Sequence, residues 1–70
     1  MKILDSTKSI AAQMSYRYFV INEAGEFSNR NEYGYAIGFC FVSKAAGSIV
    51  AARRRHSLWD SVEGRFVDLS

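Results

Sequence analysis

The chain has 70 residues, of which 49% are apolar, and a formal net charge of +2. A chain this short hides only about 60% of its unfolded surface, so it supports one core and one domain, residues 1–70. The apolar content excludes a disordered chain. The small net charge excludes a whole-protein field strong enough to indicate nucleic acid by itself.

Cysteine content and the N-terminus bear on the compartment. Cys40 is the single cysteine, whereas small domains in oxidising compartments usually carry several disulfides. The stretch MKILDSTKS lacks the apolar run of a secretory signal. Residues 33–52 carry only Lys44 as a charge, but a lysine near a bilayer centre costs about 3 kcal/mol. We therefore expect a cytoplasmic protein with no membrane segment.

No proline, linker, low-complexity tract or internal repeat divides the chain, which we interpret as one continuous unit. Asp5 or Ser6 is suited to cap a helix. Such a helix would reach about Met14 and place Ile10 and Ala11 on the same side as Met14. We expect a short helix at the N-terminus.

A strand and a turn follow this helix. Residues 16–22, YRYFVIN, are dense in aromatic and β-branched side chains, which favours a strand. Gly25 can take the left-handed conformation that a short hairpin loop requires. The polar residues 28–32 either interrupt the return strand or form a long loop, and the sequence leaves both open.

Bulky and small side chains alternate over residues 33–42, which predicts another strand. The bulky positions are Tyr33, Tyr35, Ile37, Phe39 and Phe41. Because a large side chain contributes roughly 1.5 to 3 kcal/mol on burial, we expect the bulky face to lie against a helix. In the alternative, the small face packs on the helix, and the exposed aromatic face marks an interface.

A second helix is predicted over residues 44–56, where Ser43 is a good N-cap and alanines and arginines favour helix. Its expected apolar stripe consists of Ala45, Ala46, Ile49, Ala52 and His56. A strand over residues 49–55, after a turn at Gly47, is the competing interpretation.

A closing strand is predicted over residues 65–69, entered through a turn at Glu63 and Gly64. Trp59 and Val62 are expected to help cover the core. The elements predict an α+β domain: a small, mostly antiparallel sheet in the order strand, strand, helix, strand, with one helix packed on a face.

Candidate catalytic groups are few. His56, Ser57 and Asp60 are neighbours in sequence, but on one helix Ser57 points away from the other two. Cys40 and His56 supply two soft ligands, fewer than the four that a structural zinc ion requires. No glycine-rich loop is followed by the Lys-Ser/Thr pair of a phosphate-binding loop. We expect no enzymatic activity, no metal and no cofactor.

Two short stretches resemble signatures of RNA-recognition domains. GFCFV at 38–42 resembles part of the RNP1 motif, and FVIN at 19–22 resembles RNP2. The resemblance implies base stacking by Phe19, Phe39 and Phe41. It also implies phosphate contacts by Arg30 or by Arg53, Arg54 and Arg55. The segment between the motifs is too short for the helix and strand which that family places there, and Lys44 replaces the last RNP1 aromatic residue.

The expected function is binding to a partner. The candidate contact residues are Tyr35, Phe39, Phe41, Arg30, Arg53, Arg54 and Arg55. In size and single-domain build the chain looks like the small inhibitors that phages encode against host machinery, anti-CRISPR proteins among them. This likeness implies stoichiometric docking on a larger host protein or nucleoprotein complex, in the host cytoplasm. A module for single-stranded nucleic acid and a structural homodimer are the alternatives.

Overall fold

Two helices and four strands make up the fold in the computed structural model, which describes residues 1–69. The elements are α1 (Asp5–Gln13), β1 (Tyr18–Ile21), β2 (Cys40–Phe41), α2 (Lys44–Arg54), β3 (Ser57–Asp60) and β4 (Arg65–Phe66). The strands form one antiparallel sheet in the order β2-β1-β3-β4. The expected α+β class is confirmed. Within the described residues, no helix is both long and apolar enough to cross a membrane.

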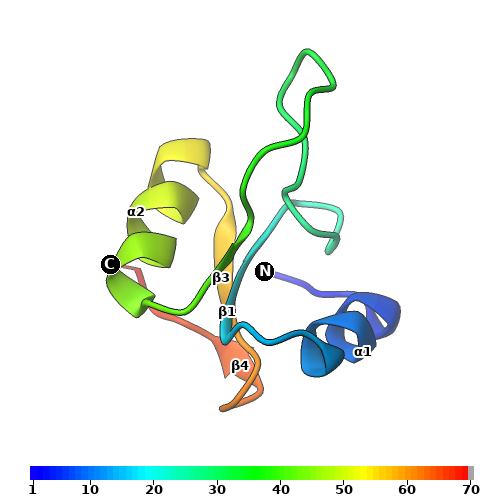
Figure 1. Ribbon diagram of the computed structural model, residues 1–70, viewed down its shortest axis with the longest axis vertical. Helices are drawn as coiled ribbons and strands as arrows, with labels where there is room; N and C mark the ends of the chain where they lie inside the picture. Colours follow the sequence, from blue (N-terminus) through cyan, green and yellow to red (C-terminus); the bar gives the residue numbers. More distant parts are fainter. Residues whose placement is uncertain (70) are drawn as a thin grey trace.

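The sheet is covered on both faces, with α1 and α2 on opposite sides of it (Figure 1). On the α1 side, the buried cluster consists of Ala11, Phe19, Ile21 and Trp59. On the α2 side, it consists of Tyr18, Val20, Ala51 and Leu58. Successive side chains of a strand point to opposite faces of the sheet. Because both faces are covered, every residue of β1 is buried. The prediction of a single covering helix was therefore incomplete, since the N-terminal helix covers the second face.

The predicted helix after Ser43 is confirmed as α2, and the competing strand over residues 49–55 is wrong. The predicted apolar stripe is also wrong, because its alanines and Ile49 are exposed and the helix buries Gly47 and Ala51. A Cβ atom added at Gly47 would lie 2.9 Å from Leu58 Cδ1. The helix approaches the sheet most closely where it has no side chain, and this approach decides which face is buried.

The predicted strand over residues 33–42 is mostly absent, since only Cys40–Phe41 pairs with β1. Phe39 packs with the cluster on the α1 side, whereas Phe41 packs with the cluster on the α2 side. Both phenylalanines are half-buried. Neither predicted orientation of a single aromatic face is correct, because the segment does not form one continuous strand.

The C-terminal third contains one strand more than expected. β3, with Leu58 and Trp59 buried, is the longest partner of β1. The predicted burial of Trp59 is confirmed, but Val62 is exposed in the turn that connects β3 to β4. The closing strand is shorter than predicted, at Arg65–Phe66.

Candidate binding surface

Residues 28–38 form an arm that projects from the body of the molecule (Figure 1). Its two limbs are joined by a hydrogen bond from Ile37 N to Asn29 O at 3.0 Å and by a bridge between Arg30 and Ala36. At its end, Tyr33 is 76% exposed and Tyr35 is 71% exposed. Two large rings therefore stand in solvent on a segment that contributes none of the fully buried core.

The end of the arm, residues 31–35, is held by hydrogen bonds; we call it the arm loop. Asn31 Oδ1 accepts hydrogen bonds from the backbone N–H groups of Tyr33 at 2.9 Å and Tyr35 at 3.0 Å. Asn31 N donates to Tyr35 O at 2.9 Å, and Gly34 has the left-handed φ of +83°. Arg30 Nη1 donates to Gly34 O at 2.9 Å. These bonds fix the backbone on which the two rings are mounted.

The same loop occurs a second time in the chain, at residues 22–26, which we call the first loop. There Asn22 Oδ1 accepts from Ala24 N at 3.0 Å and from Glu26 N at 3.1 Å, and Asn22 N donates to Glu26 O at 2.8 Å. Gly25 has a φ of +82°. The two sequences are NEAGE and NEYGY. Our expectation of a chain without repeats was wrong, because this five-residue repeat specifies one loop twice.

The repeat shows which residues the loop conformation requires. Asparagine, glutamate and glycine occur at matching positions, whereas Ala24 and Glu26 stand where the arm has Tyr33 and Tyr35. An asparagine side chain can bond to the backbone beyond it, and glycine takes the left-handed conformation without strain. The tyrosines are therefore not needed for the loop to form, and their exposure calls for another explanation.

The base of the arm is fastened to the end of α2. Arg54 Nη1 donates to Ser28 O at 2.8 Å and lies 3.4 Å from Ser28 Oγ. His56 Nδ1 lies 2.8 Å from the same hydroxyl oxygen. Ser28 is buried, and partial burial lowers the pKa of the Arg54 guanidinium, which still stays charged at neutral pH. Arg54 therefore positions the arm.

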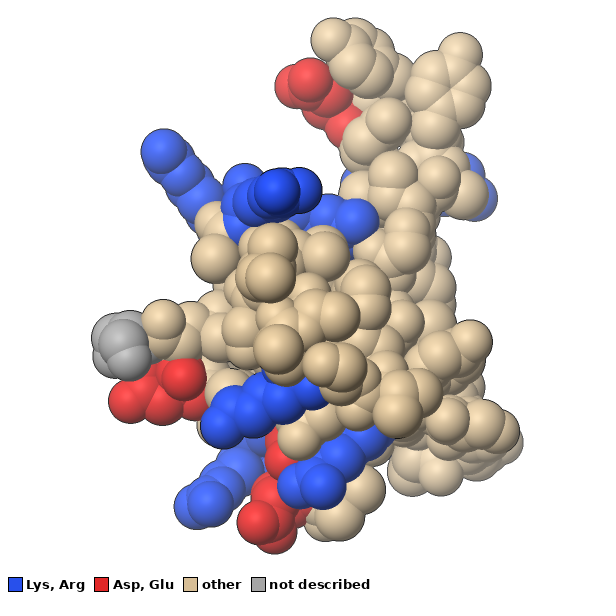
Figure 2. Space-filling model, turned by 60° about the vertical axis from the view of Figure 1, so that its left-hand side comes forward, with Lys and Arg blue, Asp and Glu red and all other residues tan. Residues whose placement is uncertain are grey.

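The arginine triplet is divided between two roles, whereas we expected all three members to be contact residues. Arg53 and Arg55 are exposed, and Arg55 ends the helix in the left-handed conformation with a φ of 58°. Figure 2 shows Lys and Arg side chains gathered beside the base of the projecting arm. We define the binding surface as the two tyrosines of the arm loop together with Arg53 and Arg55.

The two roles predict different mutational effects. Arg54→Ala is expected to lower the free energy of unfolding by about 2 kcal/mol, because the buried carbonyl of Ser28 loses its donor. Arg53→Ala, the matched control, should change it by less than about 0.5 kcal/mol. Urea unfolding measures both, and hydrogen exchange at the Ile37 amide reports on the arm itself. Equal effects of the two substitutions would contradict this division.

The remaining candidate contact residues are not part of the binding surface as defined. Phe39 and Phe41 are half-buried, and they pack with clusters on opposite faces of the sheet. Phe19 is fully buried, which contradicts the stacking platform implied by the RNP resemblance. Arg30 is in the arm, where its guanidinium donates to the Gly34 carbonyl. Sequence reasoning omitted Tyr33, which the repeat could have identified.

Two of the groups considered for catalysis, His56 and Asp60, are engaged in structural contacts. Ser28 and His56 are within hydrogen-bond distance, but the serine is only 3% exposed and Arg54 also contacts its oxygen atoms. Asp60 bonds to Arg17 instead of His56. Within residues 1–69, no group of three or more His, Cys, Asp or Glu side chains could hold a metal ion.

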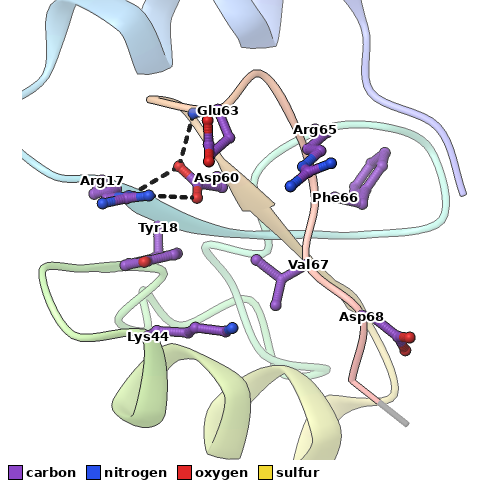
Figure 3. Close-up of a pocket in the computed structure, with 9 residues that line it drawn as sticks. All are labelled: Arg17, Tyr18, Lys44, Asp60, Glu63, Arg65, Phe66, Val67 and Asp68. Carbon is purple, nitrogen blue, oxygen red and sulfur yellow. Dashed lines mark hydrogen bonds and ion pairs between the residues drawn. The ribbon is translucent and has the colours of Figure 1, made fainter.

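A shallow cavity of about 470 Å³ lies at the other end of the molecule, with acidic and basic side chains on its wall (Figure 3). Arg17 donates to both carboxylate oxygens of Asp60, through Nε and Nη2, each at 3.0 Å. Asp60 Oδ1 also accepts from the backbone N–H groups of Val62 and Glu63. These bonds, the one to Arg17 foremost, lower the pKa of Asp60. We interpret this ion pair as a clamp on the turn between β3 and β4.

This clamp gives a pH-dependent prediction. Asp60→Asn should lower the free energy of unfolding by about 1 kcal/mol at neutral pH, since the new amide N–H₂ group cannot accept from Arg17, whose side chain is partly exposed. Because the folded-state pKa lies below the unfolded one near 4, the stabilisation is present above about pH 4 and is lost as the pH falls. Urea midpoints of the variant and the wild type should therefore converge in acid. A constant difference across this range would contradict the assignment.

No protein-family model, curated protein or solved structure matches this chain.

Proposed function

We propose that this protein is a non-enzymatic binding protein that docks on a larger protein or nucleoprotein complex and inhibits it stoichiometrically. The observation that supports this most is the pair of exposed tyrosines on a loop whose twin forms with alanine and glutamate. Tyrosine and arginine are enriched among residues that contribute most to binding energy at protein interfaces. Both residue types lie on this surface.

The fixed shape of the arm favours binding. A segment that is flexible in the free protein loses conformational freedom when it binds, and this loss weakens the affinity. A segment that is already ordered avoids most of this cost. The Asn31 side chain orders the arm loop, and the bonds of Arg54 and His56 to Ser28 order its base. The likeness in size and build to phage-encoded inhibitors, anti-CRISPR proteins among them, supports the inhibitory part and action in a host cytoplasm.

Binding of single-stranded nucleic acid is the second candidate. Exposed aromatic rings can stack on bases, and neighbouring arginines can contact phosphates. Tyr33, Tyr35 and the exposed arginines supply both kinds of group. Glu32 counts against this candidate, because an exposed carboxylate in the arm loop would face the phosphates.

Capture from a host-cell lysate, with and without nuclease, tests the proposal. The wild-type chain is compared with an arm-exchange variant, Tyr33→Ala with Tyr35→Glu, whose arm loop has the sequence of the first loop. We expect the wild type to retain a partner at a fixed molar ratio after nuclease treatment, and the variant to lose it. Retention by the variant would contradict the role of the arm. Loss of capture after nuclease treatment would favour the nucleic-acid candidate.

A further inference from the structure

The first loop is already in contact with another part of the chain, the N-terminal segment. Leu4 N donates to Gly25 O at 3.0 Å, and Leu4 has the extended angles φ −72° and ψ 150°. A Cβ atom added at Gly25 would lie 3.0 Å from Leu4 N, 3.3 Å from Ile3 Cα and 3.3 Å from Leu4 Cγ. An extended aliphatic segment therefore lies directly across the glycine and buries it.

The arm loop offers the same surface without an occupant. Gly34 is exposed, and a Cβ atom added there would have no neighbour within 4 Å apart from the adjacent residues Tyr33 and Tyr35. Its carbonyl oxygen accepts one hydrogen bond, from Arg30 Nη1, and a carbonyl oxygen has two lone pairs. The backbone geometry that contacts Ile3 and Leu4 in the first loop is thus repeated at Gly34, where Arg30 bonds to the carbonyl oxygen but no segment of the chain lies across the glycine.

We infer that the arm loop binds an extended segment of a protein partner that carries an aliphatic side chain. The side chain lies across Gly34, and a backbone N–H of the segment donates to Gly34 O, as Leu4 does at Gly25. This inference rests on the proposed function, because it assigns the partner of the same arm.

The differences between the two loops fit their different tasks. The N-terminal segment is tethered to the first loop by the chain, so its effective concentration is high and few contacts suffice. A segment from another molecule lacks this tether and needs more contact area. Tyr33 and Tyr35, both exposed and next to Gly34 in the sequence, supply that area. Glu32 in the arm loop favours a protein segment over a phosphate backbone, and Arg53 and Arg55 favour acidic residues around that segment.

The test is a titration of the isotope-labelled full chain, followed through its backbone amide signals. The probe is the hexapeptide MKILDS, which copies residues 1–6. We expect saturable shifts at residues 31–35 and none at residues 22–26, where the site is occupied. A peptide with glycine in place of its leucine should cause no shifts. Shifts caused only by a single-stranded thymidine oligonucleotide, or no shifts with either probe, would overturn the inference.

Substitutions at the two glycines provide the matched control. Gly34→Asn should leave the thermal midpoint nearly unchanged, since asparagine tolerates the left-handed conformation and the position is open. It should abolish the peptide shifts. Gly25→Asn should lower the thermal midpoint, because the new side chain meets Leu4 and Ile3. If Gly34→Asn still binds the peptide, the inference fails. The proposed function stands or falls separately, on capture by the arm-exchange variant.

Discussion

Replacing Phe19 by alanine is expected to unfold most of the protein at room temperature. The Phe19 ring is fully buried between the sheet and α1, with its centroid 5.6 Å from that of Phe27. Removing a buried phenylalanine costs about 3 to 5 kcal/mol. A single core of this size rarely supplies more than about 3 to 5 kcal/mol in total. The substitution therefore removes nearly the whole margin of stability.

Far-ultraviolet circular dichroism with thermal melting measures this effect, and Tyr35→Ala is the control. That tyrosine is exposed, so its removal should change the free energy of unfolding by less than about 0.5 kcal/mol. The comparison also decides the role of the RNP2-like stretch. A folded Phe19→Ala protein that had lost affinity for single-stranded RNA would restore the stacking role that the buried position contradicts.

Local sequence signals identified α2 but not the face that it buries. Ser43 accepts a hydrogen bond from Ala46 N, as a helix cap does, and the alanines continue the helix. The hydrophobic pattern pointed to Ile49, which is exposed. The buried face is set by the close approach of Leu58 to Gly47, a contact between distant parts of the chain. No pattern within the helix encodes that contact.

The alternation of bulky and small residues over 33–42 predicted a strand that is mostly absent, for a related reason. Alternation predicts a strand only where a neighbouring strand pairs with it, and along this segment β1 pairs as a ladder only with Cys40–Phe41. The rest of the segment is the returning limb of the arm. β3 was missed for another reason: Ser57–Asp60 is only four residues long and begins directly after the predicted end of the helix at residue 56.

The candidate surface could have been found from the sequence in part. The repeat of Asn-Glu-x-Gly-x is visible in the printed sequence, and asparagine and glycine at these positions indicate a turn. Its two copies differ most at the positions of Tyr33 and Tyr35, which singles out these residues. The division of the arginine triplet could not be predicted, because it depends on Ser28, which is 26 residues from Arg54 in the chain.

Exchanging the arm loop for the first loop is expected to weaken partner binding strongly while leaving the fold intact. Tyr33→Ala with Tyr35→Glu retains Asn31 and Gly34, so the free energy of unfolding should change by less than about 1 kcal/mol. A tyrosine that dominates an interface contributes about 2 kcal/mol or more. Each ring should therefore account for about a 30-fold change in dissociation constant.

Calorimetric titration against the captured partner measures this change, with two further variants as controls. Tyr33→Phe with Tyr35→Phe keeps both rings. This variant should retain most of the affinity if contact by the rings supplies most of the binding free energy. Tyr16→Ala removes an exposed tyrosine outside the arm and should have no effect. If Tyr16→Ala and the arm exchange lowered the affinity equally, the partner would bind exposed tyrosines in general. The arm would then have no special role in binding. The comparison of the two loops supports a binding role only if Tyr33 and Tyr35, the residues that differ between them, are the ones that contact the partner.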